Sequence, residues 1–322
     1  MHFQAFCPLT AQPLHPYHKG ITRCGIGGFF VIRKAVIPIS GWGTRVLPAT
    51  KSLPKAMLPV ADLPTIYYVV EEAVNSGIDH IVFISNRHMR AVEDFFDENG
   101  ELAQALTTKK LDHMLDRLRQ IESMARFSFV RQPNPRGLGH AVLMARETIG
   151  FEPFALLLGD DLMWNADGPP CLRQLIDVYA QRRASVIATM PVSDADVSRY
   201  GIIAGERVGP HLMQISNMVE KPLLADAPSN QAVVGRYILT PEIFEILQHT
   251  APGRGGEIQI TDALVTLLSK QPIFGYECTG TRYDTGDTVG WLTTSIAYAL
   301  RRPEFAPGLK AYLRTLDLGE TS

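Results

Sequence analysis

Apolar residues along this chain recur in two spacings, as short β-type runs and as longer stretches of helical period. The runs Ala35–Ile39, Ile81–Ile84 and Phe127–Val130 predict strands. After Pro64, apolar positions recur with the helical period and stop at Gly77, which predicts a helix between the first two strands. Strands that alternate with helices in this way predict an α/β protein with a mainly parallel sheet.

The same pattern continues through the middle of the chain. A helix is predicted over Met89–Phe96, and a longer, more charged helix over Leu102–Ile121 reads as an insertion on the surface. The continuously apolar run Phe154–Leu158 predicts a strand that is covered on both faces. A helix over Cys171–Arg182 and a strand over Ala184–Met190 follow.

Beyond this point the pattern shifts to short alternating segments, including Gly201–Ile203 and Val233–Leu239. We interpret them as the second wall of one cleft. The chain is therefore divided into an extension over residues 1–32, expected to be poorly ordered, and one domain over 33–322. That domain has a first half at 33–165, a second at 166–300 and a helical tail.

Composition narrows the class of protein. The 322 residues are 46% hydrophobic and carry a formal net charge of −2 without a basic block, which argues against nucleic acid as a partner. No apolar run approaches the ~18 residues of a membrane helix, so we expect a soluble protein without a membrane partner. The four scattered cysteines suggest neither a zinc site nor a disulfide framework, and reduced thiols are typical of a cytoplasmic protein.

The loop that follows the first strand, residues 39–59, combines glycines, prolines and cations. Gly41 and Gly43 allow backbone N–H groups to approach an anion closely, and Arg45, Lys51 and Lys55 can bind phosphate oxygens. The spacing matches neither G-x-G-x-x-G nor G-x-x-x-x-G-K-[ST]. The alternative is a plain connecting loop.

Carboxylates follow the predicted strand Phe154–Leu158. Asp160 and Asp161 lie where an open α/β sheet places its ligands, and oxygen ligands suit Mg²⁺. The alternative is a helix N-cap. Asp284, far along the chain, is a candidate second ligand, although an Asp turn before Gly286 is an equal alternative.

Two further segments carry side chains suited to a ligand. Glu220 and Lys221 close a β-type segment and could bind hydroxyls and a phosphate, or form only a surface ion pair. Gln132 can both donate and accept, as reading a pyrimidine edge requires, and Gly137 leaves room for a base beside the backbone. The alternative is a surface turn. His140, at a helix start, is interpreted as a structural donor.

These motifs, in this order, resemble the bacterial UTP:glucose-1-phosphate uridylyltransferases, within the sugar-1-phosphate nucleotidyltransferases. The resemblance covers about residues 33 to 300. The matching segments are Gly41-x-Gly43-Thr44-Arg45-x-Leu47-Pro48-x-Thr50-Lys51-x-x-Pro54-Lys55-x-Met57-Leu58-Pro59, Arg131-Gln132, Gly137-Leu138-Gly139-His140-Ala141, Asp160-Asp161, Tyr200-Gly201, Val219-Glu220-Lys221-Pro222, Val234-Gly235-Arg236-Tyr237 and Gly256-Glu257-Ile258-Gln259-Ile260-Thr261-Asp262.

The resemblance implies a three-layer α/β/α sandwich, Rossmann-like, with a central mixed, mostly parallel sheet. It implies that UTP and glucose 1-phosphate give UDP-glucose and pyrophosphate, through attack of the sugar phosphate on the α-phosphorus with Mg²⁺ as cofactor. Such chemistry needs mainly positioning and charge neutralisation. A homodimer or homotetramer is also implied.

Site roles are carried over with the resemblance, position by position. The catalytic residues would be Arg45, Lys55 and Lys221, and Mg²⁺ would be held by Asp160 and Asp284. The nucleotide would be bound by Ser40, Gly41, Gly43, Thr44, Gln132 and Gly137. The sugar would be bound by Asp161, Gly201 and Glu220.

Two positions depart from the family pattern. Ala56 stands where relatives commonly have a glutamate that helps to hold the nucleoside, and Trp42 replaces a smaller side chain. The residue at position 56 leaves open a sugar-1-phosphate nucleotidyltransferase that uses dTTP or another sugar, and a catalytically weak regulatory paralogue is a second alternative.

Overall fold

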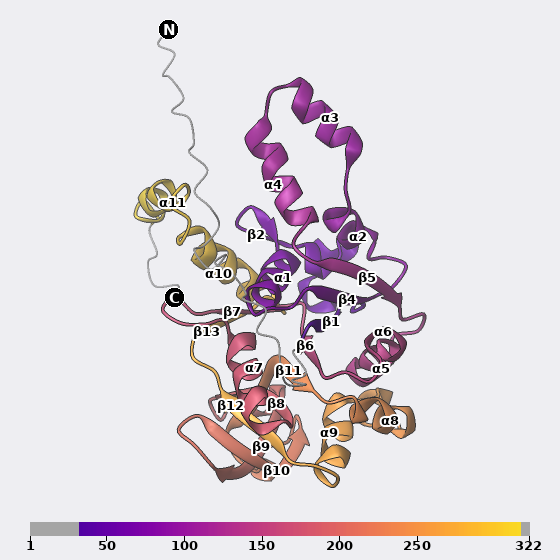
Figure 1. Ribbon diagram of the computed structural model, residues 1–322. Helices are drawn as coiled ribbons and strands as arrows, with labels where there is room; N and C mark the ends of the chain where they lie inside the picture. Colours follow the sequence, from indigo (N-terminus) through magenta and orange to yellow (C-terminus); the bar gives the residue numbers. More distant parts are fainter. Residues whose placement is uncertain (1–31, 317–322) are drawn as a thin grey trace.

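The computed structural model describes residues 32–316 and contains a nine-stranded sheet with helices on both faces (Figure 1). The sheet order is β5-β4-β1-β6-β11-β8-β12-β10-β9. Its strands are β1 (Lys34–Pro38), β4 (His80–Ser85), β5 (Arg126–Arg131), β6 (Phe154–Leu157), β8 (Ser185–Pro191), β9 (Gly201–Arg207), β10 (Leu212–Glu220), β11 (Gln231–Leu239) and β12 (Ile273–Glu277). Two small two-stranded sheets pair β2 (Pro59–Val60) with β3 (Leu63–Pro64) and β7 (Asp161–Trp164) with β13 (Thr281–Asp284).

The helices fill the connections between these strands. They are α1 (Thr65–Asn75), α2 (Arg90–Phe96), α3 (Gly100–Thr108), α4 (Asp112–Glu122), α5 (Leu138–Met144), α6 (Arg146–Ile149), α7 (Cys171–Arg182), α8 (Glu242–His249), α9 (Ile260–Leu268), α10 (Thr288–Ala299) and α11 (Ala306–Leu313). Within the described residues, no helix is both long and apolar enough to cross a bilayer.

The sheet is mixed. β5, β4, β1 and β6 pair in parallel, as do β8 and β12. β11 pairs antiparallel with both β6 and β8, and β10 pairs antiparallel with both β12 and β9. The α/β class with a mixed sheet is confirmed. Parallel pairings do not outnumber antiparallel ones between neighbours in the sheet order.

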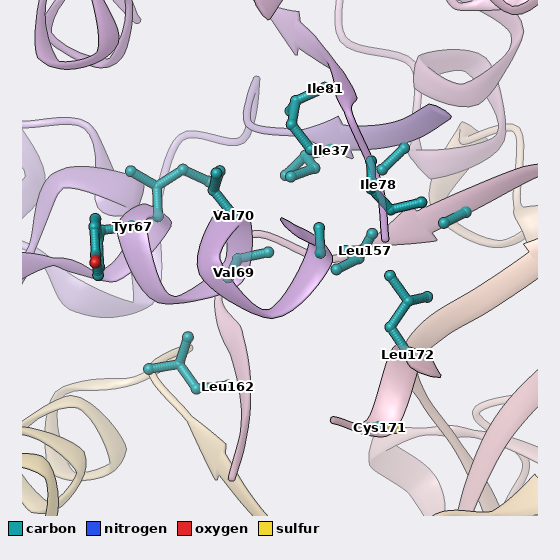
Figure 2. Close-up of a cluster of buried hydrophobic side chains, with 14 of the residues drawn as sticks. Ile37, Tyr67, Val69, Val70, Ile78, Ile81, Leu157, Leu162, Cys171 and Leu172 are labelled. Carbon is teal, nitrogen blue, oxygen red and sulfur yellow. The ribbon is translucent and has the colours of Figure 1, made fainter. Parts of the chain in front are cut away.

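Successive residues of the central strands enter two different hydrophobic clusters, as the alternation of side chains along a strand requires. Ile37 and Leu157 pack with α1 and α7 in one cluster, whereas Val36 and Leu156 pack with α5, α8 and α9 in the other. Figure 2 shows the first cluster, with Ile37 and Leu157 beside Val69 and Val70 of α1. Burial of each such side chain stabilises the fold by about 1.5–3 kcal/mol.

The predicted helix Leu102–Ile121 was wrong as a single element. Lys110 has φ 56°, and this left-handed residue separates α3 from α4, so the two form a hairpin that projects from the body (Figure 1). Asn99 starts α3, because its side-chain oxygen accepts a hydrogen bond from Leu102 N. The extension predicted over residues 1–32 lies outside the described residues except for Ile32, which is buried in the core.

Candidate active site

One cavity of about 290 Å³ opens beside the ends of β6 and β10, the start of β9 and the middle of β11. Its walls combine cations, carboxylates and small residues from segments that are far apart in the sequence. It gathers seven of the predicted site residues, namely Arg45, Asp160, Asp161, Gly201, Glu220, Lys221 and Asp284. Chemically, such a set can bind an anionic ligand that also carries hydroxyl groups.

The loop predicted to bind an anion, residues 39–59 and called here the anion loop, follows β1 and is shaped by short turns. Gly43 has φ 64°, in the left-handed region, and the Thr50 hydroxyl donates to its carbonyl at 2.8 Å. A Cβ added at Gly41 would contact nothing within 4 Å, so the backbone there is open to a ligand. The Arg45 guanidinium reaches across to Gly286, where an added Cβ would lie 2.9 Å from its Nη2. Thr44 is exposed beside Arg45.

Strand pairing brings Asp284 to the Asp160–Asp161 turn, because Asp284 is the register partner of Asp161 in the antiparallel β7–β13 pair. The backbone N–H and the hydroxyl of Thr285 both donate to the Asp160 carbonyl, at 3.0 and 2.8 Å. Asp284 Oδ1 also accepts from Gly286 N at 2.6 Å, so the Asp turn is present, and Asp284 lines the cavity as well. The helix-cap alternative for Asp160 and Asp161 was wrong, because a strand follows them.

Lys55 forms an ion pair with Asp160 Oδ2. Burial raises the pKa of the Asp160 carboxyl, but the charges of Lys55 and Arg45 outweigh burial and hold that pKa below its ordinary value. Asp160 is therefore ionised at neutral pH. No group of three or more His, Cys, Asp or Glu residues suited to a metal occurs in the described part of the chain, so any metal here would rely on two carboxylates plus ligand oxygens.

Asp161 is buried, and its two oxygens face different partners. Oδ2 accepts from Gly235 N at 3.0 Å, and Oδ1 lies 2.7 Å from Arg282 Nε. Burial raises the pKa of Asp161 in spite of the nearby Arg282 and Arg236. A Cβ at Gly235 would lie 2.8 Å from Asp161 Oδ2, so glycine is required for this approach.

Arg282 is a cavity residue that the sequence analysis missed. Besides Asp161 it contacts Asp284 Oδ2 at 3.3 Å, and it donates to the Tyr200 hydroxyl at 3.0 Å. Its spacing of two from Asp284 on one strand, which places both side chains on the same face, was the available signal.

The sugar-side residues meet across the β9–β10 ladder, where Gly201 pairs with Glu220. A Cβ on Gly201 would lie 3.2 Å from Glu220 Oε2, and Thr261 donates to that same oxygen at 2.7 Å. Lys221 has φ 46°, so a turn intervenes and its Nζ lies 3.5 Å from Glu220 Oε1. Both side chains therefore face the cavity rather than opposite faces.

The predicted base-reading residues lie outside the cavity wall. Gln132 is 1% exposed; its Oε1 accepts from the Ser40 hydroxyl and its Nε2 lies 2.7 Å from His140 Nδ1. Gly137 has φ 98°, and a Cβ there would lie 2.8 Å from both Glu257 Cβ and Ile258 O. Its lack of a side chain thus lets the backbone pack against residues 257–258. His140, predicted as a structural donor, contacts the Gln132 amide through its Nδ1.

A fully buried ion pair lies beneath the site. Arg236, on β11, donates to Glu72 Oε2 of α1 at 2.7 and 3.1 Å and to the carbonyl of Asp161 at 2.6 Å. Glu72 Oε1 in turn accepts from Leu172 N at the start of α7. Arg236 therefore holds the backbone of the Asp160–Asp161 turn, called here the acidic turn, against α1 and α7.

The two positions that depart from the family pattern differ in environment. Ala56 is 7% exposed and packs in the core cluster with α1, so its side chain does not face the cavity. Trp42 is 62% exposed, and its ring centroid lies 5.3 Å from that of His88.

Comparison with known proteins gives consistent matches over most of the chain. Residues 34–298 match the Nucleotidyl transferase family model. A UTP–glucose-1-phosphate uridylyltransferase of Streptococcus pneumoniae is 50% identical over 90% of this chain and 97% of its own length. One from Staphylococcus epidermidis is 45% identical over 89% of this chain and 99% of its own length.

Solved structures agree with these matches. A UDP-glucose pyrophosphorylase complexed with UDP-glucose is 44% identical, with a TM-score of 0.78 over 84% of this chain and 100% of that one. A UTP-bound UGPase from Acinetobacter baumannii is 38% identical, with a TM-score of 0.84 over 89% of this chain and 100% of that one. On the matched residues, the shared fold and the extent of identity, the chain belongs to the nucleotidyl transferase family, among the UTP–glucose-1-phosphate uridylyltransferases.

Proposed function

We propose that this protein converts UTP and glucose 1-phosphate into UDP-glucose and pyrophosphate. The observation that carries this proposal is the 45–50% identity to UTP–glucose-1-phosphate uridylyltransferases over nearly their whole length. The cavity supports it, because cations from the anion loop, strand-end carboxylates and the Glu220–Lys221 pair surround one space. A phosphate oxygen of the sugar phosphate would attack the α-phosphorus and release pyrophosphate.

The anion loop would hold the triphosphate. Its open backbone at Gly41, the left-handed turn at Gly43, and Ser40 and Thr44 beside them would present donors to phosphate oxygens. Arg45 and, once it leaves Asp160, Lys55 would neutralise the charge that develops in the transition state. The role of these residues is binding and charge stabilisation, since the reaction needs no protein nucleophile.

Asp160 and Asp284 would hold a Mg²⁺ ion. The donor set fits this ion: both groups are carboxylates, they line the same cavity, and Asp160 is ionised. When bound, the ion would neutralise phosphate charge and orient the nucleotide. The ion pair with Lys55 shows that the Asp160 carboxylate accommodates a positive charge beside it.

The opposite wall would hold the sugar phosphate. Glu220, fixed by Thr261, and buried Asp161 would accept hydrogen bonds from sugar hydroxyls beside Gly201. Lys221, half exposed in the turn after β10, would bind the phosphate. On the nucleotide side, Gln132 and Gly137 would read uracil.

The direct test is an assay of pyrophosphate release by purified protein. UTP, dTTP, CTP, ATP and GTP are each combined with glucose, galactose and mannose 1-phosphates in the presence of Mg²⁺. We expect the highest kcat/KM with UTP and glucose 1-phosphate. Absence of turnover with every pair would favour the regulatory paralogue and refute the proposal, whereas preference for dTTP would assign the chain to a thymidylyltransferase.

We also propose a cytoplasmic homodimer or homotetramer built as a three-layer α/β/α sandwich. Support for self-association comes from α10, where Val289, Leu292 and Ile296 lie on one helical face and are 71%, 50% and 41% exposed. Light scattering of the purified protein would measure the assembly, and a monomeric mass at micromolar concentration would refute it.

A further inference from the structure

Three buried side chains form a hydrogen-bonded row from the anion loop to helix α5. Ser40 donates to Gln132 Oε1, and Gln132 Nε2 lies 2.7 Å from His140 Nδ1. Their exposed fractions are 6%, 1% and 4%. Because buried polar groups are costly to leave unsatisfied, this row has to adopt one consistent assignment of donors and acceptors.

The carbonyl of Gly137 decides that assignment. It lies 3.5 Å from Gln132 Nε2, and a carbonyl oxygen can only accept. The amide nitrogen, not the amide oxygen, therefore faces Gly137 and His140. It follows that His140 Nδ1 accepts a hydrogen bond and that the imidazole carries its proton on Nε2.

A neutral ring agrees with its surroundings. Burial lowers the pKa of His140, and the charge of Arg136 lowers it further. A protonated ring would place an Nδ1–H against the amide N–H groups of Gln132, which is repulsive.

After its hydrogen bonds with Ser40 and His140 are formed, the Gln132 amide still has one oxygen lone pair that can accept. Its second N–H makes only a long contact, to the Gly137 carbonyl. This edge presents an acceptor beside a donor, which matches N3–H and a carbonyl oxygen of uracil. Cytosine has the reverse pattern, an N3 acceptor and an amino donor, and would pair only if the amide were turned over. Thymine has the uracil pattern, so this edge does not separate the two.

We propose that His140 is a positioning residue that fixes the orientation of the Gln132 amide and thereby makes the nucleotide site select uracil over cytosine. This inference rests on the proposed function, in which Gln132 reads the base. Because Gln132 is 1% exposed, a base reaches this edge only if neighbouring residues move aside.

The test compares kcat/KM for UTP with kcat/KM for CTP, at saturating glucose 1-phosphate, in four proteins: wild type, His140→Leu, His140→Asn and His80→Leu. His140→Leu removes the acceptor, so the UTP/CTP ratio should fall by about tenfold or more, as expected when one bidentate base contact loses its orientation. His140→Asn can place Oδ1 near the position of the histidine Nδ1, so its UTP/CTP ratio should be close to that of the wild type. His80→Leu removes another histidine contact, to Ser128 on β5, and should leave the ratio unchanged.

The tautomer gives a readout that does not depend on activity. In long-range ¹H–¹⁵N spectra of protein labelled at histidine, assigned with the His140→Asn variant, His140 should show an unprotonated Nδ1 and a protonated Nε2 at pH 7.5. A proton on Nδ1 would overturn the inference even if His140→Leu did not fold. An unchanged UTP/CTP ratio in folded His140→Leu would also overturn it, whereas lack of wild-type turnover with UTP would refute the proposed function instead.

Discussion

Arg236 of β11 and Glu72 of α1 form an ion pair in which the arginine side chain is 0% exposed and the glutamate side chain 5%. Glu72 and the Cys171 thiol lie close enough to affect each other, and burial raises the pKa of that thiol strongly. The pair thus lies where α1, α7 and β11 converge beneath the acidic turn. Because both charges are buried, the free energy of unfolding should depend on whether the two are removed singly or together.

Removal of one member of the Arg236–Glu72 ion pair should destabilise the fold far more than removal of both. Arg236→Met leaves Glu72 buried without its partner and should cost about 3–5 kcal/mol of unfolding free energy. The double variant Glu72→Leu/Arg236→Met removes both charges and should recover most of that loss. Urea denaturation measures both values. As a matched control, Arg173→Ala breaks an exposed pair with Asp177 on α7 and should cost at most about 0.5 kcal/mol. Equal losses in the single and double variants would contradict this account.

Gly201→Ala should impair use of the sugar phosphate without unfolding the protein. The added Cβ would lie 3.2 Å from Glu220 Oε2 and 3.5 Å from Thr261 Oγ1, so the carboxylate has to shift. We expect KM for glucose 1-phosphate to rise about tenfold, which corresponds to ~1.4 kcal/mol. Gly100→Ala, where an added Cβ meets nothing within 4 Å, is the control and should leave KM unchanged. An unaltered KM in Gly201→Ala would remove Glu220 from the proposed sugar contacts.

Lys221→Ala should weaken productive use of the sugar phosphate while UTP binding persists. Loss of a hydrogen bond to a charged phosphate typically costs about 1.5–3 kcal/mol, so kcat/KM for glucose 1-phosphate should fall roughly ten- to hundredfold. Calorimetry measures UTP binding separately. Lys310→Ala, on α11, is the control lysine outside the cavity. If UTP binding collapsed and sugar-phosphate use did not, the assignment of Lys221 would be wrong.

Asp160→Asn should remove most activity, by about a hundred- to thousandfold, because the site loses a carboxylate for the metal and a partner for Lys55. Chelation of divalent cations should abolish turnover in the wild type, and Mg²⁺ should restore it. Electron paramagnetic resonance with Mn²⁺ as a probe measures cation binding without reference to activity. The exposed Asp167→Asn should behave as wild type. Full Mn²⁺ binding by Asp160→Asn would exclude Asp160 as a ligand.

Acidification should destabilise the fold partly through His80. Burial lowers the pKa of His80 below its ordinary value of 6.5, and the charges of Arg126 and Lys34 lower it further. The unfolded chain then takes up a proton more readily than the folded one, so this contribution to stability is complete above pH 6.5 and decreases as the pH falls below it. Urea midpoints at pH 7.5 and 5.5 test this. The decrease should be smaller in His80→Gln than in wild type, and an equal decrease would contradict it.

Sequence patterns predicted the elements whose signal is local. The apolar run Phe154–Leu158 and the helix after Pro64 were found because burial on both faces, helical period and a terminal glycine are visible within a few residues. The break at Lys110 was missed because lysine carries no sequence signal for the left-handed region.

Long-range partners were the part that could not be predicted. Arg236 and Glu72 are 164 positions apart, and no local feature indicates that they meet. Arg282 was missed although it lies two positions before Asp284, because its contact with Asp161 depends on the β7–β13 register. The roles of Gln132 and Gly137 in reading uracil came from family resemblance and stay predictions.

Strand β11 limits how far the two walls of the cavity can move relative to each other during catalysis. It forms backbone hydrogen bonds with β8 on one side and with β6 and β9 on the other, so a single strand ties together the two walls of the cavity. The walls cannot swing apart as separate bodies unless those backbone bonds break. The movements that let substrates enter and pyrophosphate leave therefore occur in the connecting loops, and the sheet stays rigid throughout turnover.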